Sequence, residues 1–346
     1  MSSSARTKLG RFAAALCVLA TTAAAAAELE RVRIGLAREA SSGPLYIAAA
    51  EGYFKSEGLD AQLVFFPSDA AVRAAAASGV VEVGAAALTA AFYRDAAAHG
   101  LKIFASQVSD QTGFPMYTLV IGRRAHDAGF AGVRELPGRR IGMTDPDAGV
   151  RYALYSVGTR FGIDSATIKL VWLQTPGREL EALAQGEIDA AVVPFATAVQ
   201  SARKGDVLIH LSNFALWQEG VVFARAQELA DKRSTVTKFM RAYRRGTAEY
   251  HLNFLHYDDG GDFIQGPRYT EYLKLIAAEA RVPPDVLAVT KTYCDPLAML
   301  NVADISNQVK FWQRTGRLDT QRSASDFLDL SFTGLAQEAA SGLPAR

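Results

Sequence analysis

Short apolar runs alternate with segments of helical spacing over the first two-thirds of the chain. Val32 to Leu36 and Leu63 to Phe66 have the length and the β-branched or aromatic content of strands. Between them, Pro44 to Gly52 has helical spacing and begins with a proline, whose missing N–H costs nothing in the first turn of a helix. Strands that alternate with helices predict parallel βαβ units with right-handed crossovers.

The same order of motifs occurs twice. Ile34-Gly35-Leu36 recurs as Ile141-Gly142-Met143, and Gly58-Leu59-Asp60 recurs as Gly162-Ile163-Asp164. Most of the matching pairs are offset by 104–107 residues. Chance similarity between two alanine-rich stretches is the alternative, but the shared order of strand, glycine loop, helix and turn favours a duplication. Two such units predict an α/β protein with two lobes rather than one long sheet.

Beyond Arg225 the pattern becomes helical and contains no third copy of the repeat. Ser234 to Asn253 reads as a long amphipathic helix. The further helices are expected at about 269–280, 285–292, 302–315 and 324–337. We expect this helical tail to pack onto a lobe.

The first 27 residues have the layout of a secretory signal. Three basic residues, Arg6, Lys8 and Arg11, precede an apolar run from Phe12 to Ala20, and small residues follow up to Ala27. The run is shorter than the ~20 residues that span a bilayer. We therefore expect a signal peptide over 1–27, cleavage after Ala27, a periplasmic location and no membrane insertion.

The charge balance changes with that cleavage. The whole chain has 37 basic and 36 acidic residues, a net charge of +1. Removing the three basic residues of the leader leaves 34 against 36, so the mature chain carries about −2. A near-neutral chain lacks the electrostatic footprint of a nucleic-acid binder. One cysteine, Cys294, remains after cleavage, so no internal disulfide is possible.

The loops that follow the strands are the candidate binding site. In open α/β sheets, ligands bind outside the carboxyl ends of the strands, and helix starts there favour an anion. A turn or capping role is the alternative for any single residue. The candidates in the two repeats are Ser41, Ser42, Gly43, Leu45, Ser68, Asp69, Leu88 and Thr89, then Gly149, Val150, Arg151, Phe195 and Ala196.

Arg151 and the aromatic residues refine this picture. A cation in the first turn of a helix is disfavoured by the dipole, so Arg151 either faces an anionic ligand or pairs with an acid such as Asp147. Trp217 and Phe195 are among the aromatic residues that could wall the site. Catalytic signals are weak: the chain has no G-x-S-x-G elbow, no P-loop and no zinc-ligand spacing. We expect no enzymatic activity, no metal and no cofactor.

Four stretches carry a resemblance to a known family. They are Pro44-Leu45-Tyr46-Ile47-Ala48, Glu51 to Asp60, Leu136 to Met143 and Ala184 to Ala191. With them the chain resembles the periplasmic solute-binding proteins of ABC importers, in the group that serves sulfonates, taurine, nitrate and the pyrimidine precursor of thiamine. The resemblance covers residues 31–225 well and the tail loosely.

The resemblance implies a two-lobed periplasmic-binding-protein architecture with two crossing strands, near Tyr117–Ile121 and Val221–Ala224. The first lobe would comprise 28–118 and 223–346, and the second 119–222. Hinge closure of such proteins encloses a ligand. By position the resemblance adds Gln107 to the candidate site.

The expected function is a monomeric receptor that delivers a small organic, anionic or aromatic solute to the transmembrane subunits of an ABC permease. The acids Asp145 and Asp147 in the second-lobe loop weaken an assignment to sulfonate or nitrate. An exported enzyme on the same fold and a ligand sensor for another membrane protein remain the alternatives.

Overall fold

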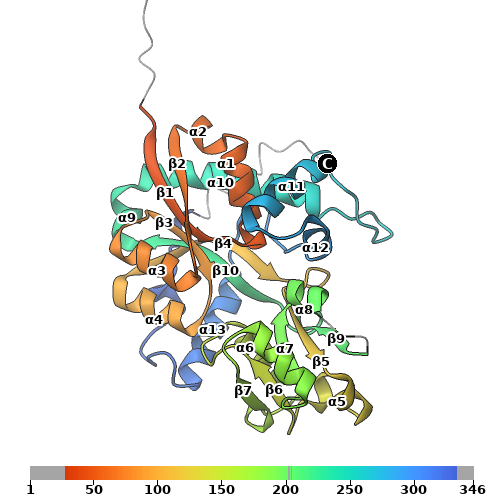
Figure 1. Cartoon of the computed structure of the whole chain (residues 1–346). Helices are drawn as coiled ribbons and strands as arrows, with labels where there is room; N and C mark the ends of the chain where they lie inside the picture. Colours follow the sequence, from red (N-terminus) through yellow and green to blue (C-terminus); the bar gives the residue numbers. More distant parts are fainter. Residues whose placement is uncertain (1–27, 202, 204, 333–346) are drawn as a thin grey trace, which may run out of the picture.

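The computed structural model describes residues 28–332 except 202 and 204, and the expected leader lies outside this range. Two five-stranded mixed sheets form two lobes (Figure 1). The first sheet has the order β2-β1-β3-β10-β4, and the second β7-β6-β8-β5-β9. The predicted α/β two-lobed fold is confirmed.

The first lobe has helices on both faces of its sheet. Its strands are β1 (Glu30–Ala37), β2 (Leu59–Phe66), β3 (Val83–Ala87), β4 (Leu101–Asp110) and β10 (Trp217–Arg225). Its helices are α1 (Gly43–Ala50), α2 (Tyr53–Ser56), α3 (Asp69–Ser78) and α4 (Ala90–His99), with a 3-10 turn at Ala40–Ser42.

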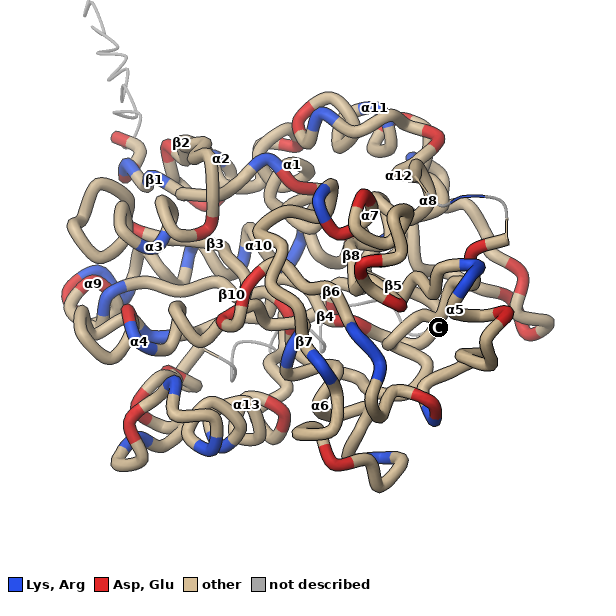
Figure 2. The backbone as a smooth tube through the Cα atoms, turned by 60° about the horizontal axis from the view of Figure 1, so that its bottom comes forward, with Lys and Arg blue, Asp and Glu red and all other residues tan. Residues whose placement is uncertain are grey.

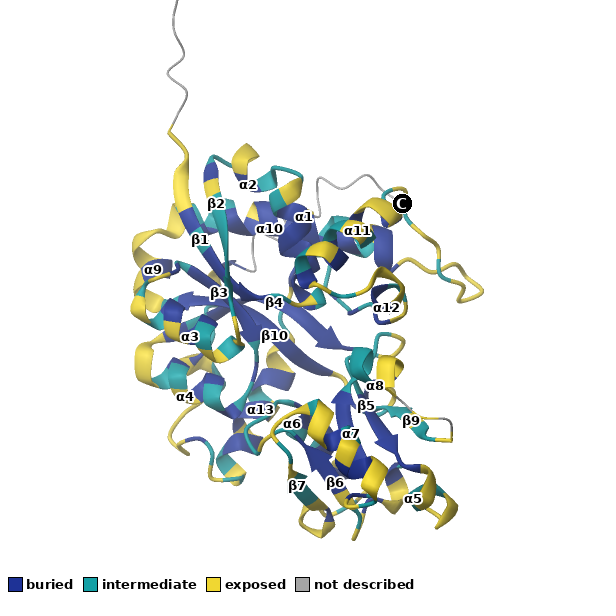
Figure 3. Ribbon diagram, in the orientation of Figure 1, coloured by how far each residue is buried: buried dark blue, intermediate teal, exposed yellow. Residues whose placement is uncertain are grey.

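The second lobe repeats this arrangement with shorter elements. Its strands are β5 (Tyr117–Ile121), β6 (Arg140–Met143), β7 (Lys169–Trp172), β8 (Ala190–Pro194) and β9 (Val207–His210). Its helices are α5 (Arg123–Asp127), α6 (Val150–Arg160), α7 (Pro176–Gln185) and α8 (Phe195–Ser201), with 3-10 turns at Val133–Glu135, Ser165–Thr167 and Leu211–Asn213. Its strands β5, β6 and β8 are mostly buried, whereas β7, β9, α5 and the outer side of α7 are more exposed (Figure 3).

Residues 107 apart occupy equivalent places in the two lobes. Ile34 pairs with Leu63 and Val83 in the parallel ladders of the first sheet. Ile141 pairs in the same way with Leu170 and Ala190 in the second. The repeat seen in the sequence is therefore a repeat of strand order and register.

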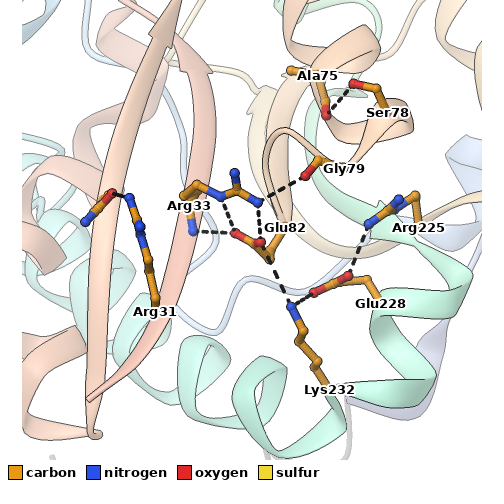
Figure 4. Close-up of polar contacts among 10 residues, drawn as sticks. Arg31, Arg33, Ala75, Ser78, Gly79, Glu82, Arg225, Glu228 and Lys232 are labelled. Atoms are coloured by element: carbon orange, nitrogen blue, oxygen red, sulfur yellow. Dashed lines mark hydrogen bonds and ion pairs between the residues drawn. The ribbon is translucent and has the colours of Figure 1, made fainter. Parts of the chain in front are cut away.

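An arginine–carboxylate pair marks the amino end of each repeat. Arg33 donates from its backbone N–H (2.7 Å), Nε (3.1 Å) and Nη2 (2.6 Å) to Glu82, and from Nη2 to the carbonyl of Gly79 (3.0 Å) (Figure 4). In the second lobe, Arg140 makes the same four contacts with Asp189 and the carbonyl of Gly186. Each pair ties the first strand of its repeat to the segment that leads into the third.

The two lobes exchange one strand each. β5 runs antiparallel to β8 and β9 in the second sheet, and β10 runs antiparallel to β3 and β4 in the first. The chain therefore crosses between lobes over 111–116 and 214–216. The predicted crossings at 117–121 and 221–224 lie inside β5 and β10. The predicted second lobe includes Trp217–Val222, but these residues pair within the first sheet, because β10 lies between β3 and β4.

The tail is helical and touches both lobes. Its helices are α9 (Ala226–Asp231), α10 (Arg233–Phe254), α11 (Tyr269–Ala280), α12 (Pro284–Val289) and α13 (Val302–Arg314). α10 packs on α1 and α2, α12 lies against α8, and α13 lies against β10 (Figure 1). The helix expected over 324–337 is instead two 3-10 turns, Ala324–Asp326 and Leu330–Phe332, and residues 333–337 lie outside the described range.

Candidate functional site

The candidate site lies at the inter-lobe junction, where the loops after the strands of each lobe meet near the crossing segments. The backbone N–H of Ala90 donates to the carbonyl of Asp147 (3.1 Å) and joins the lobes directly. The N–H of Phe195 donates to the carbonyl of Met116 (2.8 Å), which continues the β5–β8 ladder of the second sheet toward the first crossing. A Cβ on Gly149 would lie 2.5 Å from the carbonyl oxygen of Leu88. The two lobes are therefore in close contact beside the candidate loops.

The tail closes the junction from one side through Asp304 on α13. This carboxylate accepts hydrogen bonds from the Tyr152 hydroxyl of the second lobe (2.6 Å), the Gln218 backbone N–H (2.8 Å) and Gln308 Nε2 (2.9 Å). The Tyr152 ring also packs on Phe311 of α13. α13 thus fixes the second lobe and β10 relative to each other.

Four carboxylates gather at the junction. Glu39 follows β1, Asp69 starts α3, Asp110 ends β4, and Glu219 lies in β10. Glu39, Asp69 and Asp110 each lie close enough to Glu219 to repel its charge. Basic and acidic residues are spread over both lobes (Figure 2), so this grouping of one sign is a local feature.

The pKa values of the four carboxyl groups in this cluster are raised. Desolvation by the surrounding protein atoms, with repulsion from Asp69, raises the pKa of Glu39 to about 7. Solvent nevertheless reaches part of the Glu39 side chain. Burial raises the pKa of Asp110 to about 7 despite hydrogen bonds from Met116 N–H and Trp217. Burial and the neighbouring acids also raise the pKa of Glu219 well above its usual range.

Two protein carboxylates lie near helix starts on the first-lobe side. Glu39 precedes the 3-10 turn that leads into α1 and accepts a hydrogen bond from Ser41 Oγ (3.3 Å). Asp69 is in the first turn of α3, where its Oδ2 accepts from the N–H of Ala87 (2.9 Å). Asp69 complements the dipole of α3, whereas α1 and α4 have no acidic residue in their first turns.

Two nearly buried side chains carry unpaired oxygens at the junction. Glu219 is 7% exposed, and its Oε1 accepts from the Tyr117 hydroxyl (3.3 Å). Gln107 is 4% exposed, and its Nε2 donates to Ser42 Oγ (3.1 Å). Glu219 Oε2 and Gln107 Oε1 have no hydrogen-bond partner among the described residues. The junction therefore offers acceptors.

Comparison with known proteins places this arrangement in a family. The family described as NMT1/THI5 like matches residues 39–253, which span both lobes and the crossing segments. The chain belongs to the NMT1/THI5-like family. No curated protein matches the chain by sequence.

Solved structures with the same fold include periplasmic binding proteins of ABC importers. The aliphatic sulphonate-binding protein of Escherichia coli is 14% identical, with a TM-score of 0.67 over 87% of this chain and 92% of that one. The alkanesulfonate-binding protein of Xanthomonas axonopodis pv. citri is 16% identical (TM-score 0.63; 88% and 100%). The nitrate-binding protein of Synechocystis is 12% identical (TM-score 0.61; 92% and 92%). At these identities the likeness shows the fold alone.

In this NMT1/THI5-like chain, several predicted site residues have structural roles. Ser68 and Thr89 cap α3 and α4, where their hydroxyls accept from Ala71 N–H (3.3 Å) and Phe92 N–H (3.0 Å). Gly43 faces the rings and chains of the tail helices. The remaining three, Leu45, Leu88 and Val150, are buried core residues.

Arg151 lies away from the four carboxylates. Its Nη1 donates to the carbonyl of Pro146 (2.9 Å), and its guanidinium lies over the rings of Trp172 (5.7 Å) and Phe311 (5.9 Å). Arg151 forms no ion pair with Asp147 among the described residues, although the Asp147 charge acts on it, and its role as an anion clamp stays a prediction. Asp147 instead pairs with Arg94 (2.5 Å) and Arg317 (3.0 Å).

The remaining predictions fall at the junction. Ser41, Ser42, Asp69 and Gln107 lie around the carboxylates, as described. The other four lie where the lobes meet. Gly149 packs closely against the Leu88 carbonyl and the Trp217 ring, and Trp217 donates a hydrogen bond to Asp110. Phe195 and Ala196 begin α8. The Phe195 ring meets the edge of His210 at 4.7 Å, and burial lowers the pKa of His210.

Sequence reasoning missed Glu39, Asp110 and Glu219. Each is an acid at a place where the pattern expects an apolar or small residue, at the end of a strand or inside one. That mismatch was the available signal. The described residues contain no group of three or more His, Cys, Asp or Glu side chains placed to hold a metal ion. Within the same residues, no helix is long and apolar enough to cross a membrane.

Proposed function

We propose that this protein is a periplasmic receptor that binds a small organic solute at the inter-lobe junction and delivers it to an ABC permease. The observation that carries the proposal is the contact of the duplicated strand-end loops at one junction, where Glu219 and Gln107 present unpaired oxygens although both side chains are more than nine-tenths buried. Neither oxygen is among the fully buried atoms without partners, so both are open to solvent and a bound solute can donate hydrogen bonds to them.

The expected aromatic character of the solute has support in the junction. The Tyr117 and Trp217 rings lie 6.0 Å apart, centroid to centroid, beside Glu219. The expected anionic character lacks support, because Arg151 packs elsewhere and Asp69 occupies the start of α3. A signal peptide over 1–27, a monomeric state and the lobe boundaries at the two crossings belong to the same proposal.

A thermal-shift screen with mass spectrometry of the bound compound tests the proposal. A receptor is stabilised by RT ln(1 + [L]/Kd), about 2.7 kcal/mol at a hundredfold excess over Kd. It also releases the compound unchanged. A compound that is converted by the protein, with no unreacted ligand recovered, would contradict the receptor function.

An exported enzyme is the second candidate, because the raised pKa values of Glu39 and Asp110, about 7, suit proton transfer near neutrality. Turnover that is lost in Glu39→Gln would favour the enzyme. Unchanged ligand with intact binding in the same variant would favour the receptor.

A further inference from the structure

The inter-lobe junction has an excess of negative charge and acceptor atoms. Glu39, Asp69, Asp110 and Glu219 face it from β1, α3, β4 and β10, and their neighbour Tyr117 comes from β5. Arg73 is the basic residue that acts on Asp69, and it is already paired with Asp95 at 2.8 Å. No described Lys or Arg forms an ion pair with Glu39, Asp69, Asp110 or Glu219.

Two unpaired oxygen atoms at the junction indicate a ligand that donates hydrogen bonds. Glu219 Oε2 and Gln107 Oε1 are unpaired on side chains that are 7% and 4% exposed. Gln107 Nε2 donates to Ser42. The amide oxygen Oε1 of Gln107 therefore faces Gly220, the neighbour of Glu219 in the chain.

Aromatic faces stand next to these oxygens. The Tyr117 hydroxyl touches Glu219, and its ring neighbours Trp217. A carboxylate pairs with the charge of an ammonium group, and the face of a tyrosine or tryptophan attracts the same cation and packs on its alkyl substituents.

We propose that the junction binds an organic cation, a solute with an ammonium or amidinium group, in preference to a sulfonate or nitrate. The proposal rests on the receptor function above and names its ligand class. The cation takes the place of the protons that the crowded carboxyls otherwise hold. Its binding therefore releases protons and becomes tighter as the pH rises through the range in which Glu39 and Asp110 ionise.

A charge-matched set of small probes tests this. Choline carries a permanent positive charge, 3,3-dimethyl-1-butanol has the same shape without the charge, and isethionate is an anion of similar size. We expect choline, at millimolar concentration and pH 8, to raise the melting temperature and to bind in calorimetry, with the other two giving no effect. Between pH 8 and pH 5.5 the affinity for choline falls about thirtyfold for each carboxyl with a pKa of about 7 that must ionise.

Two variants locate the effect. Glu219→Gln keeps the shape but cannot give up a proton to become a carboxylate when a cation binds, and is expected to weaken choline binding about tenfold or more. Glu187→Gln, at an exposed position outside the junction, is the control and leaves binding unchanged. Calcium chloride as an additional probe separates an organic cation from a metal ion.

The outcomes separate the two proposals. Tighter binding of isethionate than of choline, or the absence of any choline effect at pH 8, overturns the cation inference. Binding of choline that is equal at pH 5.5 and pH 8, equal in Glu219→Gln or matched by 3,3-dimethyl-1-butanol also overturns it, as does a response to calcium alone. If isethionate or the alcohol binds and is released unchanged, the receptor function stands without the cation.

Discussion

The indole Nε1 of Trp217 donates a hydrogen bond to Asp110 Oδ2 at 3.1 Å, and both residues are almost completely buried. Asp110 ends β4 just before the first crossing, and Trp217 begins β10 just after the second. Oδ1 of the same carboxyl accepts from the N–H of Met116 in the first crossing (2.8 Å). One side chain thus joins both segments that connect the lobes.

Trp217→Phe is expected to destabilise the protein. It removes the only side-chain donor to Asp110 within the described part of the chain and leaves a buried oxygen unpaired, which costs about 1–3 kcal/mol of the free energy of unfolding. Urea unfolding measures the loss. Trp172→Phe, at an exposed tryptophan of the second lobe, is the matched control with a change below about 0.5 kcal/mol. Equal midpoints for the two variants would show that the hydrogen bond contributes nothing.

Gly149→Ala is expected to hold the lobes apart. The new Cβ would lie 2.5 Å from the Leu88 carbonyl oxygen and 3.0 Å from the Trp217 ring. Because both neighbours are packed in place, the Gly149 backbone itself must move away from the first lobe. The variant should bind ligand about tenfold or more weakly and show a larger radius of gyration in small-angle X-ray scattering. Gly177→Ala, where the new Cβ would meet only Thr175 Oγ1, at 4.0 Å, beyond the adjacent residues and the backbone of its own helix, should leave both quantities unchanged.

Glu179 lies in the core of the second lobe, at the position where the first lobe has Val72. Both residues are fully buried, 107 positions apart, each on the helix that follows the second strand of its repeat. Neither oxygen of Glu179 has a hydrogen-bond partner among the described residues, and its Cγ lies 3.6 Å from the Cβ position of Gly142. Burial raises the pKa of Glu179 to about 8.

Glu179→Val, which copies the first lobe, should therefore stabilise the protein by about 1–3 kcal/mol. The native state holds a proton that the unfolded chain releases at a pKa near 4.5, so wild-type stability falls as the pH rises from about 4.5 to about 8. Glu179→Gln should remove that part of the slope. Melting temperatures from pH 4 to pH 9 give both results, and parallel curves for wild type and Glu179→Gln would contradict the assignment.

Glu82→Gln is expected to affect stability and not binding. Glu82 accepts three hydrogen bonds from Arg33 at the amino end of β1, far from the strand ends that form the junction. Loss of its charge should lower the unfolding free energy by about 1–3 kcal/mol. Arg33 holds the pKa of Glu82 below its usual range against the effect of burial, so this stability is present above pH 4.5 and is lost as the pH falls below it.

Asp189→Asn, at the equivalent pair of the second lobe, should behave in the same way. Urea unfolding and calorimetry with the same ligand check both variants. Weaker binding at unchanged stability would show that these pairs act on the junction.

The duplication could be recognised from the sequence because the features that repeat are local. A strand of apolar residues, a capped helix and a glycine at a left-handed turn each depend on their neighbours in the chain, as at Gly79 and Gly186. The exchange of β5 and β10 was expected only from the family resemblance, which implied crossing strands near 117–121 and 221–224. A crossing strand has the same apolar pattern as any other buried strand, so the pattern alone does not show that β5 lies between β8 and β9 or β10 between β3 and β4.

The candidate site divides along the same line. The loops after the strands were predicted, and Ser42, Asp69 and Gln107 lie at the junction. Whether a Ser caps its own helix, as Ser68 does, or faces the junction depends on the backbone geometry of each turn. The packing of Arg151 could not be predicted, because α13, more than 150 residues later in the chain, brings Phe311 under its guanidinium.

By itself the sequence determined the two α/β repeats, the helical tail, the near-neutral charge and the family resemblance, because periodicity and local turn chemistry fix these within one unit. Only the tertiary structure decided the sign of the charge at the junction. Glu39, Asp69, Asp110 and Glu219 are as much as 180 residues apart in the chain, and each alone reads as a turn, a helix start or a strand residue. Chain crossing and strand exchange bring them together at the inter-lobe junction.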